Sequence, residues 1–201
     1  RIAAARPDDG VLGEEGGDRA GTSEVRWIVD PLDGTVNFLF GIPQWAVSIA
    51  AEDEQGMLVG VVYDPERDEL FSAERGGTAT LDGRVITGST KQDLATALVA
   101  TGFGYHADVR RAQAELAARL MPQVRDVRRF GAAALDLAWT ACGRLDAYYE
   151  HGLNAWDLAA GGLICECAGL VVKPLEPVGP SRPGVVVGPP TLVDALLPWL
   201  A

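Results

Sequence analysis

The segment "WIVDPLDGTVNF", residues 27–38, places two aspartates three positions apart around a proline and follows them at once with Gly-Thr. Pro31 fixes its own φ angle and pushes the preceding residue into an extended conformation, so Asp30 is expected to end a strand. Gly34 lets the backbone approach a ligand closely, and residues 35–38 can begin a helix whose free N–H groups favour an anion. We therefore predict a strand, a tight turn and a helix start here.

The two aspartates of this segment admit two interpretations. Asp30 and Asp33 could face one ion across the turn, with the Leu32 carbonyl between them as a further oxygen ligand. Ligand sets made only of oxygen select Mg²⁺, Mn²⁺ or Ca²⁺. Alternatively, the segment is only a strand–turn–helix junction in which Asp33 caps the helix. The segment alone does not distinguish the two.

Two other segments carry acids of similar type. "LGEEGG" places Glu14 and Glu15 between glycines, where an exposed loop is the alternative to a ligand-binding turn. In "NAWDLAAGG", Asp157 lies three residues after a predicted Asn154 N-cap, where an acid stabilises the helix whatever else it does. All three acidic segments lie at predicted strand ends or helix starts, where α/β proteins place ligand sites. Carboxylates that meet there would repel one another unless divalent cations neutralised them.

Hydrophobic patterning divides the chain into two parts. Residues 45–76 have the alternation of an antiparallel meander, and residues 79–85 fit a further hairpin. Beyond a boundary near residues 88–94, strands and helices alternate. We therefore predict an α+β part at residues 1–90, incomplete at its start, and an α/β part at residues 91–201. The elements predicted in the second part are strands at 94–103, 124–130, 144–150 and 184–188 and helices at 108–124, 131–143, 156–169 and 190–200.

The composition argues against several classes of protein. A formal net charge of −11 disfavours a nucleic-acid groove, which needs clustered lysine and arginine. No run reaches the ~18 to 20 consecutive apolar residues of a membrane helix, so no membrane contact is expected. Cys142, Cys165 and Cys167 are an odd number without a disulfide framework spacing, which indicates a reducing cytoplasm. We interpret all three as small apolar residues.

The two ends of the chain differ in character. "RIAAARPDDG", residues 1–10, contains no signal-peptide core and has the pattern of the last turns of a helix that lead into a turn. We therefore expect the sequence to begin within a structural element. "KPLEPVGPSRPG", residues 173–184, is predicted to be a proline-rich loop.

Taken together, the motifs resemble those of a known family. "GEE", "WIVDPLDGTVNF", "RRFGAAALDL" and "AYYEHGLNAWDLAAGGLICECAG" are similar in content and order to the motifs of the inositol monophosphatase family, from about residue 10 to the end. That family comprises Mg²⁺-dependent, lithium-sensitive phosphatases of small phosphate monoesters, usually homodimers with a layered α/β/α/β/α architecture. The resemblance implies the same fold, two or three Mg²⁺ ions that Mn²⁺ could replace, and inhibition by Li⁺.

The resemblance also implies a metal site. Its expected ligands are Glu14, Asp30, the Leu32 carbonyl, Asp33 and Asp157. Glu15 would be a neighbouring acid.

A substrate site is implied next to these ligands. Thr35, with Asp33 and Glu14, would lie near the attacking water, and the Gly34 and Thr35 N–H groups would hold phosphate oxygens. Asp33 and Asp157 would also face the substrate. Glu150 matches the acid that accepts hydrogen bonds from substrate hydroxyls.

A helix start made of small residues would line the same pocket and leave room for a sugar-sized ring. These residues are Gly131, Ala132 and Ala133.

The activity implied by the resemblance is hydrolysis of a small polyol or sugar phosphate, with myo-inositol 1-phosphate as the expected substrate. One metal would lower the pKa of a bound water, and a second would stabilise the departing ester oxygen, without a covalent intermediate. No Cys or His stands in a recognisable nucleophile motif, which agrees with a metal-only strategy.

Three alternatives stay open. The same scaffold serves histidinol phosphate, fructose 1,6-bisphosphate and 3′-phosphoadenosine nucleotides, and an acid at Glu150 suits a polyol or the amine of histidinol phosphate. Family members also act as protein partners of the transcription and RNA machinery, independently of phosphatase activity. The third alternative is a catalytically silent metal-binding fold.

The sequence departs from the family pattern ahead of "GEE". The family carries a helical pair there and a short Thr-Asp segment, with a Lys and an Asp near the metals. No counterpart precedes Arg1 in this sequence. We therefore expect the layered fold without those helices.

Overall fold

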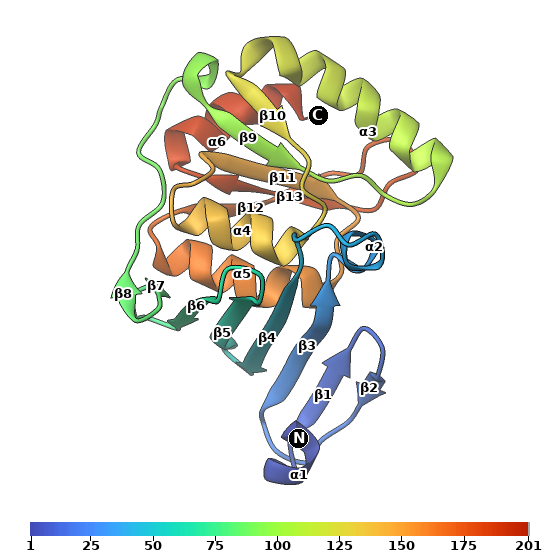
Figure 1. Cartoon of the computed structure of the whole chain (residues 1–201), viewed down its shortest axis with the longest axis vertical. Coiled ribbons are helices and arrows are strands. Elements are labelled where there is room, and N and C mark those ends of the chain that lie inside the picture. The colour runs from blue at the N-terminus through green and yellow to red at the C-terminus, as the bar shows by residue number, and fades with distance from the viewer. Residues whose placement is uncertain (201) are drawn as a thin grey trace.

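Helices and sheets alternate in layers in the structure, a computed structural model that describes residues 1–200 (Figure 1). The helices are α1 (Ile2–Ala5), α2 (Thr35–Leu39), α3 (Ala107–Leu120), α4 (Ala133–Ala141), α5 (Ala155–Cys167) and α6 (Pro190–Leu196), with 3-10 turns at Leu94–Thr96, Met121–Gln123 and Leu197–Trp199. From the top of Figure 1 downward, α3 and α6 cover a five-stranded sheet, α4 and α5 form the next layer, and an eight-stranded sheet lies below them.

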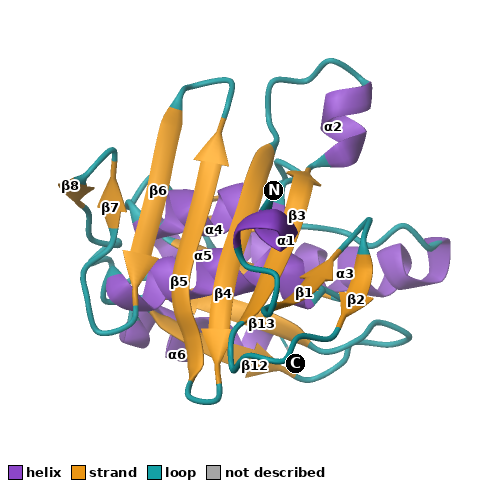
Figure 2. Ribbon diagram, turned by 90° about the horizontal axis from the view of Figure 1, so that it is seen from below, coloured by secondary structure: helices purple, strands orange, loops and turns teal. Residues whose placement is uncertain are grey.

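The eight-stranded sheet comes from the first part of the chain. Its strands are β1 (Gly10–Gly13), β2 (Gly17–Arg19), β3 (Arg26–Asp33), β4 (Ala46–Asp53), β5 (Gly56–Asp64), β6 (Glu69–Glu74), β7 (Thr80–Leu81) and β8 (Arg84–Val85). They lie in the order β2-β1-β3-β4-β5-β6-β7-β8, and all neighbours are antiparallel except β1 and β3. Figure 2 shows this sheet with α4 and α5 behind it.

The five-stranded sheet is mixed and comes from the second part of the chain. Its strands are β9 (Leu98–Thr101), β10 (Asp126–Arg128), β11 (Ala147–His151), β12 (Val171–Leu175) and β13 (Gly184–Gly188). Their order is β10-β9-β11-β13-β12, with β10, β9 and β11 parallel and β13 antiparallel to both of its neighbours.

The main hydrophobic core lies where α4 and α5 are enclosed between the two sheets. It joins Val62 and Phe71 of the larger sheet to Leu137 of α4, Ile164 of α5 and Tyr148 of the smaller sheet, and each of these side chains is fully buried. Burial of this much apolar surface is the main stabilising term in a domain of this size. The core therefore fixes the positions of the helix starts relative to the strand ends.

The expected fold class is confirmed. The predicted meander corresponds to β4, β5 and β6, and the predicted hairpin at residues 79–85 corresponds to β7 and β8. In the second part, the four helices and four strands expected from the pattern are all present, and all but the strand at residues 184–188 are shorter than predicted. Cys165 is fully buried as an apolar residue should be, whereas Cys142 and Cys167 are only partly buried, and all three are free thiols.

Strands are present in one segment for which an exposed loop was an open alternative and in another that was predicted as a loop. β1 and β2 flank a turn at residues 14–16, so the acidic "LGEEGG" segment is the tip of a hairpin rather than an open loop. The pattern failed there because these strands are short and rich in glycine. β12 extends through residues 173–175 of the predicted proline-rich loop. Pro174 is tolerated because β12 is an edge strand that pairs only with β13.

In the part of the chain that the structure describes, no helix has the length and apolar character needed to cross a membrane.

Two adjacent glycines of α5 give a test of how tightly this helix packs. A Cβ at Gly161 would lie 2.6 Å from Leu137 Cβ, whereas a Cβ at Gly162 would meet Leu158 at an ordinary 3.5 Å. Gly161→Ala should therefore lower the free energy of unfolding by about 1–3 kcal/mol. Gly162→Ala should be neutral or raise it by up to about 1 kcal/mol through helix propensity. Urea unfolding of both variants measures the difference, and equal effects would contradict the packing described.

Candidate metal and substrate site

The site lies at the carboxyl end of β3, which continues past Asp30 to Asp33 instead of ending at Asp30 as predicted. Asp30 is 2% exposed, and its Oδ1 accepts a hydrogen bond of 2.9 Å from the Leu32 N–H across Pro31. The pairing of β3 with β4 shifts register between Asp30 and Asp33. This irregularity, imposed by the proline, turns both aspartates toward the same buried side of the sheet.

Asp33 caps a helix, but not the helix that follows it in sequence. Its Oδ1 accepts from the Ala133 N–H at 3.1 Å and its Oδ2 from the Ala134 N–H at 2.8 Å, in the first turn of α4. The N-cap residue of α4 is Ala132, which has no oxygen to offer, and α2 begins at Gly34 without a side-chain cap. The interpretation of Asp33 as the cap of the following helix is therefore wrong, because its side chain points into the protein.

Asp157 lies in the first turn of α5, where it takes part in a capping box. Asn154 caps the helix with its side chain, and the Asn154 N–H donates to Asp157 Oδ2 at 2.7 Å. The predicted capping role is confirmed. Asp157 Oδ1 is not used by this box, so the acid can stabilise the helix start and still present an oxygen to a ligand.

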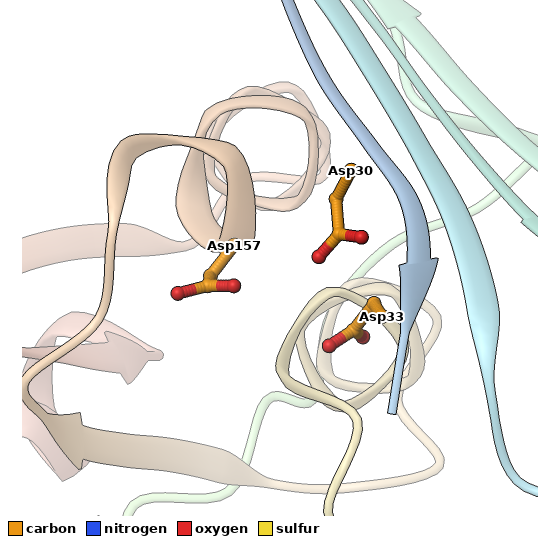
Figure 3. Close-up of side chains that lie close together, drawn as sticks. All are labelled: Asp30, Asp33 and Asp157. Atoms are coloured by element: carbon orange, nitrogen blue, oxygen red, sulfur yellow. The ribbon is translucent and has the colours of Figure 1, made fainter. Parts of the chain in front are cut away.

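Asp30, Asp33 and Asp157 meet at one point. Each offers an oxygen, and these three oxygens lie within 4.8 Å of one another. Figure 3 shows the carboxyl groups of the end of β3 and the start of α5 gathered around a common space. Among residues 1–200, this is the one group of three or more His, Cys, Asp or Glu side chains arranged so that they could hold a metal ion.

Burial makes ionisation of this cluster unfavourable. Desolvation raises the pKa of Asp30 to about 7, and the like charges of Glu14 and Asp157 add to the effect. The pKa of Asp33 is raised well above its usual value by complete burial and by its two neighbours, and burial also raises the pKa of Asp157. A divalent cation would remove the penalty by replacing repulsion with attraction. The donor set of carboxylate oxygens fits a hard cation such as Mg²⁺, Mn²⁺ or Ca²⁺.

A cavity of about 550 Å³ opens over the cluster. Its wall includes Glu14, Leu32, Gly34, Thr35, Gly131, Ala133, Glu150 and Arg182 as well as the three aspartates. The volume is within the range of small-molecule sites. The structure thus brings most of the sequence-predicted residues to one pocket.

Other predicted site residues lie outside the cluster of three aspartates. Glu14 is exposed at the tip of the β1–β2 hairpin, close enough to Asp30 to raise the pKa of that acid, whereas Glu15 does not line the cavity. Ala132 is fully buried behind the wall. The Leu32 carbonyl accepts a hydrogen bond from Thr35 Oγ1 at 3.0 Å, which leaves one lone pair for another partner.

Glu150 of β11 also lines the cavity. Burial raises the pKa of its carboxyl group to about 7, opposed by a hydrogen bond of 2.7 Å that the Tyr148 hydroxyl donates to Oε2. The carboxyl group lies directly over Gly102, where a Cβ would come within 1.9 Å of Oε2. Any side chain at this position would displace the acid.

Among the residues that the sequence did not indicate are Gly102 and Arg182, which line this pocket, and Tyr148, which supports Glu150 without lining it. Tyr148 could have been found, because it lies two residues before Glu150 on one strand and so shares its face. Gly102 follows the end of β9, which is a weak signal at most. Arg182 comes from the segment that was predicted only as a loop, and no local pattern indicates that its side chain reaches the cavity.

The chain is similar to known proteins in both sequence and fold. The model of the inositol monophosphatase family matches residues 1–192. Inositol-1-monophosphatase SuhB of Mycobacterium tuberculosis is 47% identical over 98% of this chain and 71% of its own length. Nus factor SuhB of Escherichia coli is 41% identical over 98% of this chain and 75% of its own length. The crystal structure of the extragenic suppressor protein suhB from Bartonella henselae superposes with a TM-score of 0.92 at 39% identity, covering 99% of this chain and 78% of that one.

The raised pKa values predict how the metal-free protein responds to pH. The folded pKa of Asp30, about 7, exceeds its unfolded value of ~4, so its contribution to stability is present below about pH 4 and lost as the pH rises through 7. In the presence of a chelator, the melting temperature should therefore fall between about pH 5 and about pH 8 by more than it does in Asp30→Asn. Added Mg²⁺ should restore the loss at the higher pH. Differential scanning calorimetry of both proteins gives the comparison, and identical pH profiles would contradict it.

Proposed function

The chain belongs to the inositol monophosphatase family, and we propose that it is a Mg²⁺-dependent phosphatase of small polyol or sugar phosphates, with myo-inositol 1-phosphate as its substrate. The observation that carries this proposal is the meeting of three buried aspartates beneath a cavity that also presents Glu150. Such a cluster is costly to bury without cations, and a phosphate dianion is the kind of ligand that bound cations attract.

The residues of the chain have distinct roles in the proposed reaction. Asp30, Asp33 and Asp157 would hold divalent cations together with Glu14 and the Leu32 carbonyl. When bound, these cations supply Lewis-acid activation of a water molecule and stabilisation of the leaving oxygen.

On the substrate side, Thr35 and Gly34 border the cavity beside Asp33, where their N–H groups would orient the phosphate oxygens. Gly34 has a positive φ of 88°, and a Cβ there would lie 3.0 Å from the Gln44 carbonyl oxygen, so glycine alone suits this turn.

Glu150 would accept hydrogen bonds from the hydroxyl groups of the substrate. A buried carboxylate that already accepts from Tyr148 retains further lone pairs for the vicinal hydroxyls of a polyol ring. The small residues Gly131 and Ala133 leave space for that ring beside the metal cluster. Histidinol phosphate and fructose 1,6-bisphosphate are the alternative substrates within the same reaction class.

The first test removes one proposed metal ligand. Asp30→Asn keeps an oxygen for the Leu32 N–H but removes the charge that binds cations. Mg²⁺-dependent phosphate release from inositol 1-phosphate should fall by more than about 100-fold, because the cations supply several kcal/mol of transition-state stabilisation. Phosphate release is measured colorimetrically with a chelator-treated control. Retention of wild-type activity by a correctly folded Asp30→Asn protein would refute the proposed metal role.

The second test concerns substrate selectivity. Glu150→Gln preserves the shape of the side chain and an acceptor for Tyr148, but it loses the charge-assisted hydrogen bonds to substrate hydroxyls. The value of kcat/KM should fall by about 10- to 100-fold for inositol 1-phosphate. For p-nitrophenyl phosphate, which lacks the hydroxyls, it should change by less than about threefold. An equal loss of kcat/KM on both substrates would be inconsistent with hydrogen bonding between Glu150 and the substrate hydroxyls.

A second candidate function is that of a partner of the transcription machinery, favoured by the similarity to proteins named Nus factor SuhB. The Asp30→Asn variant separates the two functions. Capture of transcription proteins that persists in Asp30→Asn would support a role independent of catalysis.

We also infer a homodimer, as the family resemblance implies. Large apolar side chains on and just after α2 support it, because a monomer rarely exposes so many together. They are Val36 (43% exposed), Phe38 (49%), Leu39 (73%), Phe40 (78%) and Ile42 (48%).

A further inference from the structure

The loop between β12 and β13, residues 176–183, closes one side of the cavity. Arg182 and Ser181 of this loop line the cavity wall together with Asn154 and Asp157 of the α5 start. The loop is firmly shaped: the Val178 N–H donates to Ser181 Oγ at 3.0 Å, and Ser181 is only 7% exposed. The loop therefore has a defined conformation, and its side chains can hold neighbouring residues in place.

Several hydrogen bonds join this loop to the turn that precedes α5. The Gly152 N–H donates to the Pro183 carbonyl at 3.0 Å, and a His151 ring nitrogen pairs with the Glu176 carbonyl at 3.1 Å. Gln113 of α3 donates to the His151 carbonyl at 3.1 Å from the other side. The turn at residues 151–154 is thus held by two elements that are distant in sequence.

Arg182 makes the contact closest to the aspartate cluster. Its Nη2 donates both to the Gly152 carbonyl and, at 3.1 Å, to Asn154 Oδ1. Asn154 is the residue whose side chain caps α5 and whose N–H holds Asp157 Oδ2 at 2.7 Å. One guanidinium nitrogen therefore fixes the side chain that defines the first turn of α5, and that turn fixes Asp157.

We propose that Arg182 is a positioning residue, which holds Asp157 in place for divalent-cation binding by fixing Asn154. The inference rests on the proposed function, because it concerns the affinity of the same cation site. Arg182 donates its hydrogen bonds to Asn154 and the Gly152 carbonyl rather than to Asp157. Its positive charge also acts on Asp157 through space and lowers the pKa of that carboxyl group, so the positioning role must be separated from this electrostatic one.

Electrostatics alone predicts the opposite effect of removing this residue. A guanidinium close to a cation site repels the cation, so its deletion should strengthen cation binding through Coulomb's law. A positioning role predicts weaker binding, because a loosened Asp157 must be ordered when the cation binds. The direction of the change therefore separates the two roles.

The test measures Mn²⁺ binding by calorimetry on chelator-treated protein, without any activity assay. Arg182→Ala should raise the dissociation constant by about 10-fold, as typical for loss of a residue that orients a metal ligand. Arg182→Lys should recover most of this loss, because one ammonium nitrogen has enough N–H groups to serve both acceptors. Arg84→Ala removes an equal charge from the exposed β8, and it should change the constant by less than about twofold.

A double variant tests the route through Asn154. If Arg182 acts through Asn154, adding Arg182→Ala to Asn154→Ala should weaken Mn²⁺ binding no further. Unchanged or tighter binding in Arg182→Ala, or fully additive losses in the double variant, would overturn the inference. Should Arg182→Ala fail to fold, Arg182→Gln, whose side chain is too short for both acceptors, gives the same readout. Wild-type protein that binds no Mn²⁺ would instead refute the proposed function itself.

Discussion

The two hydrogen bonds from the first turn of α4 to Asp33 hold the site together. They join the end of β3 to a helix that begins a hundred residues later, and so connect the larger sheet to the helical layer between the sheets. Because Ala132 cannot cap α4, the helix start depends on a carboxylate supplied by another element. Gly34 and Ala132 must be small for this approach, since a Cβ at Gly34 would lie 3.1 Å from that of Ala132. A stabilising contact and a candidate metal ligand are therefore the same group.

This arrangement concentrates like charges in a place where water cannot screen them. Burial and mutual repulsion raise the pKa values of Asp30 and Asp33. The ionised cluster therefore lowers the stability of the folded protein, and the hydrophobic core must compensate for this cost. A divalent cation bound at the cluster would remove this cost, because attraction would replace the repulsion between the carboxylates. A cation bound there, beside a cavity with room for a small ligand, is the basis of the proposed phosphatase activity.

How much of the structure can be predicted from the sequence depends on how far apart in sequence the interacting residues lie. Local patterns correctly predicted the meander of β4 to β6, and the Asn154–Asp157 capping box could be read from spacing alone. The loop predicted at residues 173–175 is instead part of β12, because a proline is tolerated in a strand that lies at a sheet edge. The true partner of Asp33 and the contact of Gly102 with Glu150 join residues far apart in sequence. No periodicity or turn rule within a single segment could have predicted them.

The three aspartates share one further property, which bears on how the site would bind a cation. Each is held by a backbone N–H: Asp30 by Leu32, Asp33 by the start of α4, and Asp157 by Asn154. These bonds orient the carboxylates before any ligand arrives, so less rotational freedom is lost on binding. They differ in their supports, however. Asp30 is anchored within its own turn, and Asp33 against the rigid core. Asp157 relies on a helix start whose cap is held by a loop, so we expect the loop at residues 176–183 to be the part of the scaffold on which cation affinity depends most.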